Sequence, residues 1–89
     1  MKKVLIIEDD VNLGTTLAGN LEMEKYEVLY LTCIEDSLNK LNLFLPDIII
    51  LDVMLNGNID GFELARQIRL EKDTPILFTT SRDGAKDIL

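Results

Sequence analysis

Short apolar runs alternate with amphipathic segments along this chain. Three of the runs are nearly continuous and rich in β-branched residues, and a weaker fourth lies between the first two. In chain order they are residues 4–7, 28–31, 48–51 and 76–78. Runs this short, bounded by polar residues, are typical of strands that are buried on both faces of a sheet. The pattern therefore predicts four strands.

The segments between these runs have helical spacing. Apolar residues recur every three or four positions, which predicts helices over residues 11–24 and over residues 33–44, and a third helix after Asp60 that is marked by Phe62, Leu64, Ala65 and Ile68. Thr32 and Glu35 form a candidate capping box for the second helix, and Asp60 is the expected N-cap of the third. The last segment, residues 81–89, is typical of the start of a fourth helix.

The resulting order of elements is β-α-β-α-β-α-β. Alternation of this kind predicts an α/β fold with a doubly wound parallel sheet and helices on both of its faces. Pro46 and Pro75 each lie just before a predicted strand, where a missing N–H does not interrupt the ladder. In such sheets, ligands bind at the carboxyl ends of the strands.

Length and composition narrow the chemistry. The 89 residues allow one small domain, and 9 Lys and Arg against 16 Asp and Glu give a net charge of −7, which argues against a nucleic-acid surface. The chain has no His and a single Cys, so His-dependent nucleophilic catalysis, a zinc site of N and S ligands and an internal disulfide are all excluded. No secretory or membrane-spanning segment is evident, and we expect a cytoplasmic domain without a membrane partner.

Acidic residues follow two of the predicted strands. Glu8, Asp9 and Asp10 come directly after the first strand, and Asp52 closes the third. Because parallel strands end at one edge of the sheet, these carboxylates are expected to converge, and a cation would relieve their repulsion. Carboxylate, carbonyl and water oxygens are the ligands that Mg²⁺ prefers. A carboxylate beside Mg²⁺ is also able to accept a phosphoryl group.

Each of these residues also has a simpler interpretation. Asp9 or Asp10 could simply cap the first helix, and Asp52 could be a polar residue that merely ends a strand. The second interpretation is weakened by the apolar stretch after Asp52, which would bury an unpaired acid. The run of hydroxyl residues 79–81 could be a helix-capping cluster.

Four segments together resemble the receiver domain of two-component response regulators. They are Ile-Ile-Glu-Asp-Asp at 6–10, Leu-Pro-Asp-Ile-Ile-Ile-Leu-Asp-Val-Met-Leu at 45–55, Asp-Gly-Phe-Glu-Leu at 60–64 and Thr-Pro-Ile-Leu-Phe-Thr-Thr-Ser at 74–81. The resemblance implies a flavodoxin-like fold with strand order 2-1-3-4. It also implies a phosphoacceptor signalling domain, not a classical enzyme, that regulates transcription in the full-length protein.

The resemblance further implies roles for individual residues. Asp52 corresponds to the phosphoacceptor of a sensor histidine kinase. Asp9 is similar to the acid that binds Mg²⁺ directly, and Glu8 to its neighbour that acts mainly through water. The backbone carbonyl of Met54 corresponds to the third protein ligand.

Two further positions follow from the same resemblance. Thr80, five residues after Pro75, matches the switch hydroxyl that bonds the phosphoryl group. Met54 and Arg82 occupy the positions at which the family tunes the lifetime of the phosphoryl group, although packing and a solvated charge are equally open explanations for them.

Residues 1–89 correspond to the N-terminal three-quarters of a receiver domain. The fifth strand and helix of the family have no counterpart, nor does the Lys that pairs with the phosphoryl group. We therefore expect an open edge on the fourth strand, with dimerisation through it as one outcome, and DNA binding only through a missing effector domain. Two alternatives stay open: a docking fragment that is never phosphorylated, and a Mg²⁺-dependent phosphohydrolase, which Met54 disfavours because a second Asp usually stands there.

Overall fold

The computed structural model describes residues 1–35, 37–55, 60–82 and 85–88, and from residue 80 onwards it describes the backbone only. Within these ranges the elements are β1 (Lys3–Ile7), α1 (Val11–Met23), β2 (Glu27–Leu31), α2 (Ser37–Phe44), β3 (Ile48–Asp52), α3 (Asp60–Arg69), β4 (Ile76–Arg82) and β5 (Ala85–Ile88). The four strands predicted from the apolar runs are confirmed.

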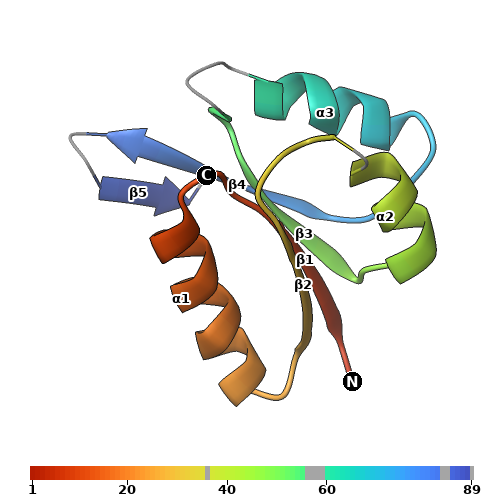
Figure 1. Cartoon of the computed structure of the whole chain (residues 1–89). Coiled ribbons are helices and arrows are strands. Elements are labelled where there is room, and N and C mark those ends of the chain that lie inside the picture. The colour runs from red at the N-terminus through yellow and green to blue at the C-terminus, as the bar shows by residue number, and fades with distance from the viewer. Residues whose placement is uncertain (36, 56–59, 83–84, 89) are drawn as a thin grey trace.

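The strands form a single twisted sheet in the order β2-β1-β3-β4-β5 (Figure 1). The first four are parallel, so the predicted order 2-1-3-4 is confirmed. Their register aligns Ile7 of β1 with Leu51 of β3, and Asp52 of β3 with Thr79 of β4. The carboxyl ends of β1, β3 and β4 therefore meet at one edge of the sheet.

Helix α1 covers one face of the sheet, and α2 and α3 cover the other (Figure 1). Successive residues of a strand point to opposite faces, so Leu5 and Ile7 pack against α2 and α3 while Ile6 lies toward α1. The larger core lies on the side of α2 and α3. Its buried members are Leu5, Ile7, Leu41, Ile49, Leu51, Leu55, Leu64, Ala65 and Ile68.

The prediction of a fourth helix over residues 81–89 is wrong. Strand β4 continues to Arg82, and β5 pairs with it in antiparallel orientation, with Thr80 opposite Asp87 and Ser81 opposite Lys86. An edge strand presents unpaired backbone N–H and C=O groups, and a returning hairpin strand satisfies them. The expected open edge of the fourth strand is therefore covered by β5 over Thr79–Arg82.

The starts of two helices differ from the predictions. Helix α2 begins at Ser37, because a turn precedes it in which the Ser37 hydroxyl and backbone N–H both donate to the carbonyl of Ile34. The predicted start at residue 33 is wrong. Helix α3 includes Asp60 in its first turn, so the prediction that Asp60 is its N-cap is wrong. Glu63 pairs with Arg66 at 2.7 Å on the surface of this helix. No helix in the described ranges is long and apolar enough to cross a lipid bilayer.

Candidate functional site

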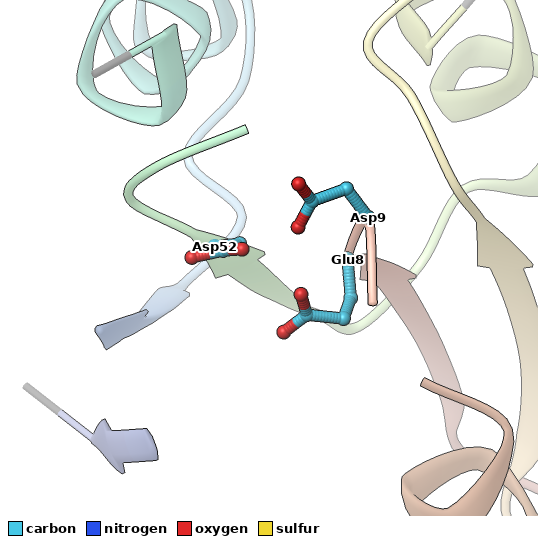
Figure 2. A group of neighbouring side chains, drawn as sticks. All are labelled: Glu8, Asp9 and Asp52. Atoms are coloured by element: carbon cyan, nitrogen blue, oxygen red, sulfur yellow. The ribbon is translucent and has the colours of Figure 1, made fainter. Parts of the chain in front are cut away.

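Three carboxylates converge where β1 and β3 end. Glu8 and Asp9 follow β1 directly, and Asp52 is the last residue of β3. One carboxylate oxygen from each of the three lies within 4.8 Å of those of the other two. Figure 2 shows the three side chains around a common space, Glu8 and Asp9 on one side and Asp52 on the other. The predicted convergence of these three acids is confirmed.

The acidic cluster, defined as Glu8, Asp9 and Asp52, is largely shielded from water. Glu8 is 3% exposed and Asp52 is 1% exposed, while Asp9 is half-buried. Ionised carboxylates at this separation repel one another, and burial adds a desolvation penalty. A divalent cation that prefers oxygen ligands would offset both costs. The donor set therefore fits Mg²⁺.

Glu8 carries the electrostatic cost of this arrangement. The pKa of its carboxyl is raised from 4.5 to about 7, first by burial and then by the neighbouring Asp52 and Asp9, against a hydrogen bond from the backbone N–H of Asp10 that lowers it. That N–H lies 3.1 Å from Glu8 Oε2. Glu8 also borders a largely apolar cavity of about 150 Å³ beneath α1, which Leu13 and Leu17 line. Without a cation, the raised pKa favours the protonated form of Glu8 over a wider pH range than for an exposed glutamate.

Backbone contacts around the end of β3 fix the position of Asp52. The backbone N–H of Met54 donates to Asp52 Oδ1 at 3.2 Å, and the N–H of Val53 donates to the carbonyl of Thr79 at 2.9 Å. The start of α3 packs tightly against this segment: a Cβ on Gly61 would lie 2.1 Å from the Asp52 carbonyl oxygen. Only glycine permits this approach, and the Asp-Gly dipeptide at 60–61 thereby contributes to the site.

Asp10 does not belong to the cluster. Its side chain caps α1, because Oδ1 accepts a hydrogen bond from the backbone N–H of Leu13 at 3.2 Å. This is the simpler of the two interpretations open for Asp10, and it is confirmed.

The other predicted residues are placed only in part. Thr79, not Thr80, is aligned with Asp52 in the strand register, and its side chain is buried beside Glu8 at the small cavity. The side chains of Thr80 and Arg82 lie outside the description. Met54 is 40% exposed, and its N–H contacts Asp52. The roles of Thr80, Arg82 and the Met54 carbonyl stay predictions.

One contact of the site has no counterpart in the sequence analysis. The hydroxyl of Tyr30, from β2, donates to the backbone carbonyl of Glu8 at 2.9 Å. Partial burial and the surrounding acids Glu8, Asp10 and Asp9 raise the pKa of Tyr30, so the phenol is a neutral donor at pH 7. Its acceptor is a main-chain atom, and no side-chain pattern would have pointed to it.

The similarity of the chain to known proteins agrees with this geometry. The family model for the response regulator receiver domain matches residues 4–89. The alkaline phosphatase synthesis transcriptional regulatory protein PhoP of Bacillus subtilis is 40% identical over 97% of the chain, and the transcriptional regulatory protein AfsQ1 of Streptomyces coelicolor is 40% identical over all of it. These matches cover 36% and 39% of the two relatives, so the chain spans less than two-fifths of their length.

A solved receiver domain has the same fold. The structure of the non-phosphorylated HemR receiver domain from Leptospira biflexa superimposes with a TM-score of 0.80 at 36% sequence identity. The match covers 96% of this chain and 68% of that one.

Proposed function

This chain belongs to the response regulator receiver domain family, and we propose that it is a phosphoacceptor switch that takes a phosphoryl group on Asp52 from a sensor histidine kinase. The observation that carries the proposal is the buried convergence of Glu8, Asp9 and Asp52 within 4.8 Å. Such a group is costly to bury without a function for its charge.

Mg²⁺ is the proposed cofactor. Asp9, Asp52 and the backbone carbonyl of Met54 would hold it directly, and Glu8 would act mainly through water. When bound, the ion supplies positive charge opposite the carboxylates and the phosphoryl oxygens. The residues of the chain provide the remainder: a shielded pocket, a fixed nucleophile and a neighbouring acid that gives up its proton near pH 7.

The transfer step uses Asp52 as the nucleophile. A carboxylate oxygen of Asp52 attacks the phosphorus of a phosphohistidine; the new O–P bond forms as the N–P bond breaks, and the leaving imidazole nitrogen takes up a proton from solvent. The hydrogen bond from the N–H of Met54 to Oδ1 orients the carboxylate for this attack. The product is an acyl phosphate on Asp52.

The output of the switch is proposed to run through β4. The hydroxyl of Thr80 would bond the phosphoryl group, and Met54 and Arg82 would set its lifetime. Two relatives are named as transcriptional regulatory proteins; by analogy, the full-length protein would regulate transcription in the cytoplasm through a DNA-binding domain outside this chain.

Phosphorylation in vitro tests the proposal. The protein is incubated with Mg²⁺ and a small phosphodonor such as acetyl phosphate, and intact mass spectrometry is expected to detect one base-labile phosphoryl group. Asp52→Asn is expected to remove it, whereas the matched control Asp73→Asn, at an exposed acid, is expected to keep it. Absence of the group on the wild type would favour the docking fragment, and release of many equivalents of phosphate would favour a phosphohydrolase.

A further inference from the structure

The ring of Tyr30 spans from the outermost parallel strand to the turn that carries two of the three acids. Its hydroxyl donates to the carbonyl of Glu8 at 2.9 Å and lies 3.4 Å from the carbonyl of Asp10. These two carbonyls flank Asp9 in the chain. One phenol therefore contacts the backbone on both sides of a candidate metal ligand.

The peptide units of Glu8 are held by β2 from both directions. The Glu8 N–H donates to the carbonyl of Leu31 at 3.0 Å, and the Glu8 carbonyl accepts from Tyr30. Beyond the end of β1 the regular ladder stops, so the second of these bonds is made by a side chain. It fixes the direction in which the chain leaves the strand, and with it the side chains of Glu8 and Asp9.

The ring reaches this position only because residue 14 of α1 is a glycine. A Cβ on Gly14 would lie 2.2 Å from Cζ and 2.4 Å from the hydroxyl oxygen of Tyr30. Glycine inside a helix is destabilising relative to alanine. Gly19 lies on the same helix, and a Cβ there would meet nothing within 4 Å. The two glycines thus separate the helix effect from the effect on the ring.

We propose that Tyr30 is a positioning residue for the acidic cluster, seated by Gly14, that holds the turn between β1 and α1 in the geometry that binds Mg²⁺. The proposal rests on the proposed function in so far as it concerns the metal. The contacts of the Tyr30 hydroxyl with the carbonyls of Glu8 and Asp10, called the clamp below, can be measured without metal.

The metal-dependent test compares hydroxyl deletions by calorimetric titration with Mg²⁺. Tyr30→Phe keeps the ring over Gly14 and is expected to weaken binding about three- to tenfold, the range for loss of one supporting hydrogen bond. Tyr26→Phe removes the hydroxyl of the other tyrosine and is expected to leave the affinity within about twofold. Gly14→Ala, which displaces the ring, is expected to weaken binding at least as much as Tyr30→Phe, while Gly19→Ala leaves it unchanged.

A spectroscopic readout separates positioning from a general loss of stability. The chain has two Tyr and no Trp. In Tyr26→Phe, all tyrosine fluorescence therefore comes from Tyr30. Its emission is expected to change with Mg²⁺ at the calorimetric midpoint, whereas the emission of Tyr30→Phe stays constant. A constant emission in Tyr26→Phe would count against the coupling of the phenol to the site.

The metal-free test is amide hydrogen exchange in the presence of a chelator. Tyr30→Phe is expected to speed exchange at Asp10, whose N–H bonds Glu8, and Tyr26→Phe is not. Unchanged exchange and unchanged affinity in Tyr30→Phe would overturn the inference. A wild type that binds no Mg²⁺ would overturn the proposed function, and the exchange data would still decide whether the clamp exists.

Discussion

Strands β1 and β3 bury two kinds of side chain in succession. Along most of their length the buried residues are apolar, and Leu5, Ile49 and Leu51 are each 0% exposed. At their carboxyl ends the buried residues are acids, and Glu8 and Asp52 are only 3% and 1% exposed. Burial therefore has opposite effects on stability in the two regions. Each buried apolar side chain stabilises the folded state by about 1.5–3 kcal/mol, whereas an ionised carboxylate loses its hydration and destabilises it.

The difference separates what holds the fold from what performs its chemistry. Substitutions in the apolar region should lower stability to the same extent with and without Mg²⁺. Substitutions in the acidic cluster should raise the stability of the metal-free protein and remove its response to Mg²⁺.

The largest loss is expected in the apolar region. Ile49→Ala leaves a cavity in the centre of the sheet and should lower the free energy of unfolding by about 3–5 kcal/mol. Urea denaturation should give the same loss in chelator and in Mg²⁺. Leu43→Ala, at a side chain that is 83% exposed, is the control and should change stability by less than about 0.5 kcal/mol. A smaller loss of stability for Ile49→Ala in Mg²⁺ than in chelator would contradict the division between the two regions.

The acidic cluster should make the stability of the metal-free protein fall as pH rises, the reverse of the usual effect of a paired carboxylate. The pKa of Glu8 is about 7 in the folded protein against 4.5 ordinarily. Between these values the folded state binds more protons than the unfolded state, so the stability of the metal-free protein should fall as pH rises from about 5 to 8. The total fall is about 3 kcal/mol as an upper limit.

Glu8→Gln provides the control for this window. The variant has no carboxyl to titrate, and its denaturation midpoint in chelator should be nearly constant from pH 5 to 8. In the wild type, Mg²⁺ binding should strengthen over the same window, because the ion competes with a proton. A wild-type profile that rises with pH would show that Glu8 is ionised throughout.

Asp52→Asn should act in the same direction with a smaller effect. It removes one charge from the cluster and keeps an oxygen that accepts the N–H of Met54, so metal-free stability should rise by about 1–2 kcal/mol. Thermal unfolding with and without Mg²⁺ measures it. The wild type should be stabilised by Mg²⁺ and the variant should not; a variant less stable than the wild type in chelator would mean that Asp52 is held by favourable contacts.

The division also explains which features were predictable from sequence. The four parallel strands were, because short apolar runs specify burial on both faces, and the cluster was, because parallel topology brings the residues after β1 and β3 to one edge. Neither inference needs side-chain detail.

The failures have a common physical origin. The end of the chain was assigned to a helix, yet β5 pairs with β4, because the demand of an open edge for hydrogen bonds is a tertiary effect. Helix α2 begins later than its apolar spacing predicts, because a local turn closed by Ser37 precedes it. Tyr30 and Gly14 were missed since their roles depend on a ring over a helix and a bond to a carbonyl.

The smallest effect is expected at the opposite end of α1 from the site. Lys25 adopts a left-handed conformation with φ of 73°, which closes the helix through bonds from Lys25 N–H to the Glu22 carbonyl and from Tyr26 N–H to the Leu21 carbonyl. A Cβ is unfavourable in that conformation and glycine is not. Lys25→Gly should therefore raise stability by roughly 0.5–1 kcal/mol.

This substitution sharpens the division because it stabilises the protein without touching the cluster. The gain should be equal in chelator and in Mg²⁺, and the Mg²⁺ affinity should be unchanged. Asp52→Asn differs on both counts, because it gains metal-free stability by removing a buried charge and loses the stabilisation by Mg²⁺. Glu24→Gly is the matched control: residue 24 has φ of −88°, where glycine offers no relief, so that variant should be destabilised. A change of Mg²⁺ affinity in Lys25→Gly would mean that the two ends of α1 are coupled. Residues outside the acidic cluster would then affect Mg²⁺ binding, against the division between the apolar region and the cluster.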